Sequence, residues 1–122
     1  MINVLIVDDS AAIRKILQRV LRQADVPVGT VFEAGDGFEA LETLKKEKIG
    51  LVLSDINMPN MDGLEFLGKV KAQAIWKDLP VIMISTEGSQ NKVLEAVGLG
   101  AVGYVRKPFT ADQIKQKLSG LF

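Results

Sequence analysis

The stretch "LVLSDINMPNMDG", residues 51 to 63, places an acidic residue directly after a short apolar run and then breaks into a Met-Pro turn. Most acids that follow a strand cap a helix. A helix cannot begin directly after Asp55, because Pro59 disfavours helical geometry at the residue before it. Asp62 is the better cap, because Glu65 lies at capping-box spacing from it. The stretch therefore predicts a buried strand that ends in an acid with a role other than capping.

Similar apolar runs recur along the chain and alternate with stretches of helical spacing. Runs that are mostly apolar throughout are typical of strands covered on both faces, as in a parallel sheet. The expected strands are residues 3–7, 30–34, 50–54, 80–84 and 101–105. Capping-box spacing at Asp36 with Glu39 and at Thr110 with Gln113 agrees with helices between and after these strands. We expect one α/β domain over residues 1–122, with β/α units forming an open parallel sheet covered by helices on both faces.

Composition narrows the classes of function. The chain has 122 residues, 48% of them hydrophobic, which is enough for one buried core. Lys plus Arg and Asp plus Glu are 15 each and no basic tract is present, so nucleic acid is not an expected direct partner. Cys and His are absent, so any metal must be held by oxygen. The sequence has neither a basic leader nor an apolar run that could span a membrane, and we expect a cytoplasmic protein.

Polar side chains gather where the expected strands end. In open α/β sheets, ligands bind outside the carboxyl ends of the strands, at the point where the strand order reverses. If that reversal lies between the first and third strands, the acids of both strands meet there. The residues at the strand ends are Asp8, Asp9, Asp55, Ser85, Thr86, Lys107 and Pro108.

Each of these residues has a simpler explanation when it is taken alone. Asp8, Asp9 and Ser10 precede a helix and could cap it. Ser85 is by default a turn or cap residue, and Lys107 is by default a solvated lysine. Only the joint placement at the strand ends argues for a site, and the argument is strongest at Asp55, which has no helix to cap.

The residue types at these strand ends suit phosphoryl chemistry. Carboxylates clustered without His or Cys attract a hard cation such as Mg²⁺, which takes one or two carboxylates together with phosphate oxygens. A carboxylate can also attack phosphorus and form an acyl phosphate, while a metal and a lysine neutralise the transferring oxygens. Such a nucleophile needs no general base, which suits a chain without His.

The chain resembles the response-regulator receiver domain of two-component signalling over essentially its whole length. The resemblance rests on "VDDS" (7–10), "SDINMPNMDG" (54–63), "PVIMISTEG" (80–88) and "GYVRKPF" (103–109), in this order and at compatible spacing. It is greatest to stand-alone chemotaxis regulators, especially in "NMPNMDGLEFL" (57–67) and in the tail from residue 103 to 122. It implies a doubly wound (βα)5 fold of the flavodoxin-like kind, with a five-stranded parallel sheet in the order 2-1-3-4-5.

The resemblance also implies roles at the matching positions. Asp55 would accept a phosphoryl group from a sensor histidine kinase or from a small acyl phosphate. Asp9 and Asp55 would bind Mg²⁺ directly, together with the backbone carbonyl of Asn57, and Asp8 would act partly through water. Ser85 would supply a hydroxyl group to the phosphoryl group.

Further roles follow from the same resemblance. Lys107 would contact the phosphoryl group, and its peptide bond to Pro108 would be cis. Tyr104 would report the switch by turning inward when Ser85 shifts. Thr86 departs from the small residue that receivers often have there, which would restrict access to the phosphoryl group.

The function implied is a switch that catalyses only its own phosphorylation and dephosphorylation. Phosphorylation would add about 1.5 to 2 negative charges near pH 7. The face formed by the fourth helix, fifth strand and fifth helix would then change shape and bind another protein, and resemblance to chemotaxis regulators points to a flagellar motor switch component. We expect a monomer.

The resemblance would place kinase docking near the basic first helix. In the simpler explanation, the basic residues of this helix only form its solvated face; they are Arg14, Lys15, Arg19 and Arg22.

Three other interpretations stay open at the level of sequence. A phosphatase of the haloacid dehalogenase type would be expected to carry a second carboxylate where Asn57 stands. A flavodoxin-like electron carrier would need a loop rich in Gly, Ser or Thr after the first strand, where "DDSAAIR" (8–14) offers acids. The chain could also be a receiver from a longer regulator with a DNA-binding output.

Overall fold

A computed structural model describes residues 1–24, 27–86 and 90–121. Two residues of the quoted motif at 80–88, Glu87 and Gly88, therefore lie outside the described residues. The helices and strands, in chain order, are β1 (Ile2–Val7), α1 (Ala11–Gln23), β2 (Val28–Ala34), α2 (Gly37–Lys46), β3 (Leu51–Ser54), α3 (Gly63–Lys71), the 3-10 helix η1 (Ala74–Trp76), β4 (Val81–Ser85), α4 (Gln90–Gly98), β5 (Gly103–Arg106) and α5 (Ala111–Ser119).

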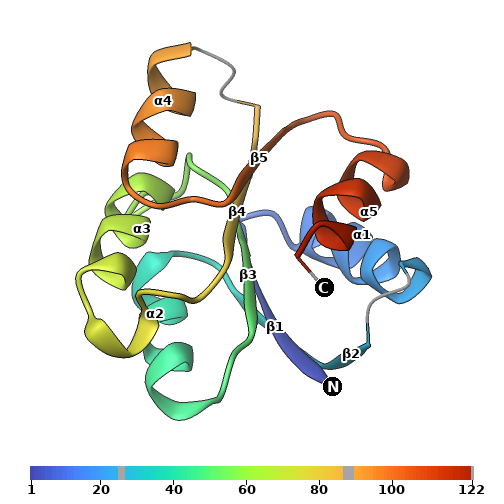
Figure 1. Ribbon diagram of the computed structural model, residues 1–122, viewed down its shortest axis with the longest axis horizontal. Coiled ribbons are helices and arrows are strands. Elements are labelled where there is room, and N and C mark those ends of the chain that lie inside the picture. The colour runs from blue at the N-terminus through green and yellow to red at the C-terminus, as the bar shows by residue number, and fades with distance from the viewer. Residues whose placement is uncertain (25–26, 87–89, 122) are drawn as a thin grey trace.

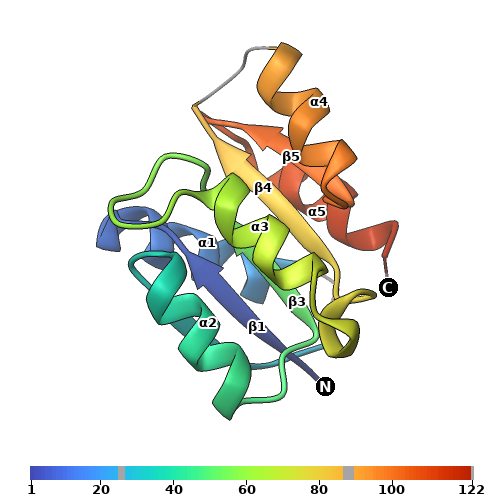
Figure 2. The same cartoon turned by 90° about the vertical axis from the view of Figure 1, so that its left-hand side faces the viewer.

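The strands form a five-stranded parallel sheet in the order β2-β1-β3-β4-β5. Helices α1 and α5 cover one face, and α2, α3 and α4 cover the other (Figures 1 and 2). This arrangement confirms the doubly wound flavodoxin-like fold. All residues of β3 and β4 are buried, which is the physical reason why these strands read as continuous apolar runs.

Strand bounds agree with the sequence to within two residues, and the change at the start of β5 has a local cause. The strand expected at 101–105 begins at Gly103. Ala101 still donates its N–H to the carbonyl of Ala96 at 3.0 Å, so it belongs to the turn that follows α4. Gly100 makes this turn with a φ of 106°, in a region that glycine adopts without steric cost.

Side-chain caps set the starts of the helices. Asp62 accepts from the N–H of Glu65 at 2.8 Å at the start of α3, as the sequence predicts. Thr110 and Gln113 form a complete capping box on α5. The first helix is capped by Ser10, so the capping explanation of the triplet Asp8, Asp9 and Ser10 is confirmed for Ser10 and wrong for the two acids. Both acids are left available for another role.

Backbone hydrogen bonds align the strand ends that carry the polar residues. Asp8 donates its N–H to Ala34 at 3.0 Å, and Asp55 donates to Val7 at 2.9 Å. Lys107 donates its N–H to the carbonyl of Ser85 at 2.8 Å. Because the strands are parallel and in this register, their carboxyl ends meet at one edge of the sheet.

The segment that connects η1 to β4 is held by a lysine side chain. Lys71 donates from Nζ to the carbonyl of Lys77 at 3.1 Å and to the carbonyl of Leu79. Burial lowers the pKa of Lys71 below its usual value, and nearby Asp78 only partly opposes this shift. The lysine thus satisfies two carbonyl groups that its own helix does not reach.

Replacing Lys71 with methionine is expected to lower the free energy of unfolding by about 1 to 2 kcal/mol, because the aliphatic stem remains but two carbonyls lose their donor. Urea unfolding followed by circular dichroism measures the change. Lys69→Met, on the exposed side of the same helix, should alter stability by less than about 0.5 kcal/mol. Equal effects of the two substitutions on stability would contradict the role of Lys71 in holding the segment between η1 and β4.

Among the described residues, no helix combines the length and the apolar character that crossing a membrane requires.

Candidate functional site

Three carboxylates converge at the carboxyl edge of the sheet. Asp8 and Asp9 follow β1 and Asp55 follows β3, and one carboxylate oxygen from each lies within 4.8 Å of the other two. Asp8 is 2% exposed and Asp55 is 7% exposed, whereas Asp9 is open to solvent. The structure therefore brings together the acids that the sequence singled out.

The backbone fixes one oxygen of each buried carboxylate. Asp55 accepts at Oδ1 from the N–H of Ile56 at 2.7 Å. Asp8 accepts at Oδ1 from the N–H of Ser10 at 2.9 Å. Their Oδ2 atoms are both directed at the same lysine, so each carboxylate is held at two points.

Lys107 bridges the two buried acids from the end of β5. Its Nζ lies 2.7 Å from Oδ2 of Asp8 and 3.2 Å from Oδ2 of Asp55, and its side chain is 12% exposed. Burial alone would lower the pKa of Lys107. The hydrogen bond that Lys107 donates to Asp8 and the charges of both carboxylates outweigh burial, and the pKa of Lys107 is raised above its usual value. The simple explanation of Lys107 as a solvated lysine is therefore wrong.

The remaining predicted residues lie on neighbouring segments of the same edge. Ser85 ends β4 and is fully buried, and Thr86 follows it at the surface. Asn57 is exposed shortly after Asp55. Tyr104 is half-buried on β5, opposite Met83 in the register. The peptide bond between Lys107 and Pro108 is cis, as the resemblance implied.

Arg14 belongs to the site region, which sequence reasoning missed. Its Nη1 donates to the carbonyl of Asp8 at 2.5 Å, and its Nε lies 2.9 Å from Oε1 of Glu33. The Arg14 side chain is only 19% exposed, so the expectation of a solvated face is wrong at this position. Burial of Glu33 would raise its pKa, but hydrogen bonds from Arg14 and Lys15 lower it overall. No spacing in the sequence links α1 to β2, so only the fold reveals this contact.

The loop between Asp55 and α3 is also fixed by contacts that spacing does not indicate. Asn60 has a φ of 68° and donates from Nδ2 to Oδ2 of Asp36 at 2.8 Å. This bond and one from the N–H of Glu39 lower the pKa of Asp36. Gly63 packs so closely that a Cβ there would lie 1.9 Å from the carbonyl oxygen of Asp55. The segment that follows Asp55 is thereby held between the starts of α2 and α3.

The residues present fit a hard divalent cation. All candidate ligand atoms in the cluster are oxygens, and clustered carboxylates favour Mg²⁺ or a similar ion. Lys107 supplies one positive charge between the buried Asp8 and Asp55. Asp9, the third acid of the cluster, faces solvent. Asp9, Asp55 and Asp8 therefore offer the oxygen ligands that such a cation prefers.

Comparisons with known proteins agree with this geometry. The family model of the response regulator receiver domain matches residues 4–119. Chemotaxis protein CheY-3 of Vibrio cholerae is 41% identical over 120 residues, which cover 98% of this chain and 91% of that protein. A CheY homologue of Campylobacter jejuni is 39% identical over 117 residues, which cover 95% of this chain and 88% of the homologue.

Solved structures are also similar over nearly the whole length of this chain. CheY4 of Vibrio cholerae has a TM-score of 0.89 at 37% identity, covering 100% of this chain and 99% of its own. CheY in the CheX-CheY-BeF3-Mg complex of Borrelia burgdorferi has a TM-score of 0.90 at 32% identity, covering 99% and 89%. The fold, the acidic cluster and the matched sequence agree, and this chain belongs to the response regulator receiver domain family, where it is similar to CheY chemotaxis proteins.

Proposed function

We propose that the protein is a CheY-type signalling switch, formed by a single receiver domain over residues 1–122, whose phosphoacceptor is Asp55. The observation that carries this proposal is the environment of the Asp55 carboxylate. One oxygen is held by the N–H of Ile56 and the other by Lys107, beside Asp8 and the exposed Asp9. Such a carboxylate is oriented at both oxygens and lies beside a lysine that can neutralise charge on a phosphoryl group.

In the proposed reaction, a carboxylate oxygen of Asp55 attacks phosphorus and the bond from phosphorus to the donor breaks. The donor, a kinase histidine or the carboxylate of an acyl phosphate, departs with the bonding electron pair. Lys107 stays close to the oxygens on which charge gathers, and Ser85 would donate a hydroxyl hydrogen to the product. Mg²⁺ held by Asp9, Asp55 and the carbonyl of Asn57, with Asp8 acting partly through water, would neutralise the phosphoryl oxygens.

The proposed output is a change at the surface of α4, β5 and α5. Apolar side chains are exposed there, with Leu94 at 60%, Val97 at 56% and Val102 at 51%. A new phosphoryl group would draw Ser85 and Lys107 toward it, and Tyr104 on β5 would turn inward with them. Thr86, exposed beside Ser85, would restrict the access of donors and water.

The proposed partners are proteins, in the cytoplasm. A CheA-like sensor histidine kinase would supply the phosphoryl group, and a flagellar motor switch component or another effector would bind the phosphorylated monomer. The CheX-CheY complex of Borrelia burgdorferi supports protein binding as the output. Relatives named for chemotaxis favour this output over the DNA-binding output of a longer regulator.

The phosphatase alternative receives less support. An enzyme of that type would be expected to place a second acid two residues after its nucleophile, and Asn57 occupies that position here. CheY-like receiver domains act as signalling switches. Activity toward a separate phosphorylated metabolite would favour the phosphatase instead.

The proposal predicts that acetyl phosphate with Mg²⁺ adds one phosphoryl group to the wild-type protein and none to Asp55→Asn. Intact mass spectrometry measures the adduct, and its loss in mild base identifies an acyl phosphate. Asp62→Asn is the matched control, because this acid caps α3 in the same motif and should leave the adduct unchanged. An adduct that persists in Asp55→Asn, or that forms equally well in EDTA, would contradict the proposal.

A further inference from the structure

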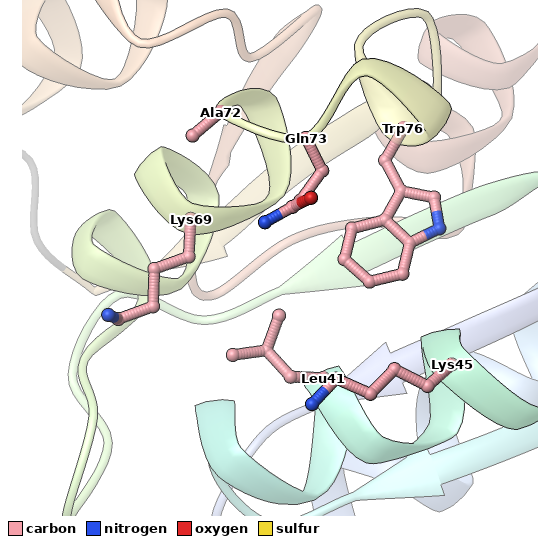
Figure 3. Close-up of a pocket in the computed structure, with 6 residues that line it drawn as sticks. All are labelled: Leu41, Lys45, Lys69, Ala72, Gln73 and Trp76. Atoms are coloured by element: carbon pink, nitrogen blue, oxygen red, sulfur yellow. The ribbon is translucent and has the colours of Figure 1, made fainter.

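A groove lies between α2 and the segment formed by α3 and η1. It contains a cavity of about 420 Å³ into which the side chains of both elements point (Figure 3). A second cavity of about 450 Å³ shares Lys45 and Trp76 with the first, so the two are adjacent. We call this surface the α2–η1 groove; its lining residues are Leu41, Leu44, Lys45, Lys46, Glu47, Lys48, Ile49, Lys69, Ala72, Gln73, Ile75 and Trp76.

The α2–η1 groove lies away from the phosphoacceptor and from the proposed output surface. Helices α2 and α3 begin at the carboxyl edge of the sheet and run back to the opposite edge, where β3 and β4 start (Figure 2). The acids follow β1 and β3 at the carboxyl edge. None of the residues that line the groove belongs to α4, β5 or α5. A ligand in the groove would therefore leave both surfaces free.

The walls of the groove are apolar and its rim is positively charged. The indole of Trp76 faces the side chain of Leu41 across the cavity (Figure 3), and Ile75 beside it is 83% exposed. One acid, Glu47, lines the groove, against a larger set of lysines. These lysines are Lys45, Lys46, Lys48 and Lys69.

The positive charge of the rim is not neutralised by the protein itself. Lys45 lies 3.5 Å from Glu42, and both side chains are more than half exposed, so this pair is worth little. Lys46, Lys48 and Lys69 have no ion-pair partner among residues 1–24, 27–86 and 90–121. The whole chain has a formal charge of zero, so the lysines mark a local excess and not a general property of the surface.

Hydrogen bonds hold the backbone of the wall that carries Trp76. Trp76 donates its N–H to Gln73 at 3.1 Å and accepts at its carbonyl from Leu79 at 3.1 Å. Lys71 holds the following segment through the carbonyls of Lys77 and Leu79. An aromatic residue whose backbone is held at a preformed cavity favours binding, because little backbone freedom is lost when a partner docks.

We propose that the α2–η1 groove docks an acidic segment of a partner protein, with an apolar side chain of that segment beside Trp76 and its carboxylates on the lysines. The concave shape admits individual side chains, whereas an anionic membrane presents a surface that cannot enter a cavity. A second copy of this chain would have to bring an acidic segment of its own to lysines on each partner. The proposed docking is independent of phosphorylation at Asp55.

Trp76 is the single tryptophan of the chain and lies in the groove, so its fluorescence reports binding there directly. The probe is a synthetic peptide, Glu-Glu-Leu-Tyr-Glu-Glu, which has no tryptophan of its own. We expect saturable change of the Trp76 emission and amide shifts in ¹H–¹⁵N spectra that centre on Leu41, Lys69 and Gln73. The peptides Gln-Gln-Leu-Tyr-Gln-Gln and Glu-Glu-Ser-Ser-Glu-Glu should each bind at least about tenfold more weakly.

A charge-reversed variant tests the lysines. Lys45→Glu with Lys69→Glu should weaken binding of the acidic peptide by about tenfold or more, equivalent to about 1.4 kcal/mol. Arg19→Glu is the control, because Arg19 is exposed on α1 at the other face of the sheet. It should leave binding unchanged, and a circular dichroism spectrum should show that each variant is folded.

Several results would overturn the proposal. They are the absence of saturable binding at millimolar peptide, binding that the lysine substitutions leave unchanged, and shifts that centre on residues outside the groove. Preferential binding to vesicles of phosphatidylglycerol would assign the surface to a membrane. Self-association in analytical ultracentrifugation that Trp76→Ala abolishes would assign it to a second copy. Each of these measurements uses unphosphorylated protein, so failure here leaves the assignment of Asp55 untouched.

Discussion

Replacing Gly63 with alanine is expected to lower the free energy of unfolding by about 3 kcal/mol, the upper part of the range for overpacking a well-packed position. The added Cβ would lie 1.9 Å from the carbonyl oxygen of Asp55, a backbone atom that no rotamer change can move. That carbonyl is held from another side by the hydroxyl of Ser54 at 2.9 Å. The helix cannot withdraw either, because the N–H of Gly63 donates to Ile56 at 2.7 Å.

The same substitution should slow phosphorylation of Asp55 by acetyl phosphate, because relief of the clash moves the acceptor itself. Urea unfolding and the rate of adduct formation measure the two effects. Gly98→Ala is the matched control, since nothing lies within 4 Å of a Cβ built at that position. The control should be neutral or more stable by about 0.5 to 1 kcal/mol, as alanine favours helix over glycine. If Gly63→Ala were as stable as the wild-type protein, the close approach of Gly63 to the carbonyl of Asp55 would be refuted.

Lys107→Met is expected to lower the free energy of unfolding by about 2 kcal/mol in EDTA. Breaking a fully buried ion pair costs roughly 3 to 5 kcal/mol, and we expect less here because Lys107 keeps some exposure and bridges at the edge of the sheet. The substitution leaves Asp8 and Asp55 close together without their cation. Because the pKa of Lys107 is raised, its contribution is complete at neutral pH and is lost only as the pH rises through the folded-state pKa.

Magnesium should restore part of this loss. The carboxylates left by Lys107→Met repel one another, and a bound cation relieves that repulsion. Thermal unfolding with and without Mg²⁺ measures the difference, which should be larger for Lys107→Met than for wild type. Lys46→Met, at an exposed lysine of α2, is the control and should show no such difference. A variant as stable as wild type in EDTA would show that Lys107 does not hold the acids together.

Most of the fold could be predicted from local patterns. The apolar runs of β3 and β4 predict strands covered on both faces, and both strands are buried throughout. Helix starts could be predicted where a capping pair stands beside helical periodicity, as at Asp62 and Thr110. The register at the start of β5 could not, because Ala101 is withdrawn from the strand by a hydrogen bond to α4 that depends on the turn at Gly100.

Some residues of the candidate site could likewise be predicted from the sequence, and others could not. Asp8, Asp9 and Asp55 could be predicted because they stand at the ends of the first and third apolar runs, and parallel strands bring their carboxyl ends to one edge. The roles of Ser85, Thr86, Tyr104 and Asn57 follow from the resemblance and stay predictions. The contact of Arg14 with the carbonyl of Asp8 was missed, because the reach of a long side chain across elements leaves no signal in sequence spacing.

The sequence by itself determined the alternation of strands and helices, the acids at the strand ends and the chemistry that oxygen ligands without His or Cys permit. These properties depend on residue type and on spacing within one element. Only the tertiary structure decided that Lys107 bridges Asp8 and Asp55, that Gly63 touches the acceptor segment, and that Trp76 meets Leu41 in a groove rimmed by lysines. Those contacts join elements far apart in the chain, and their distances are set by how helices pack on the sheet.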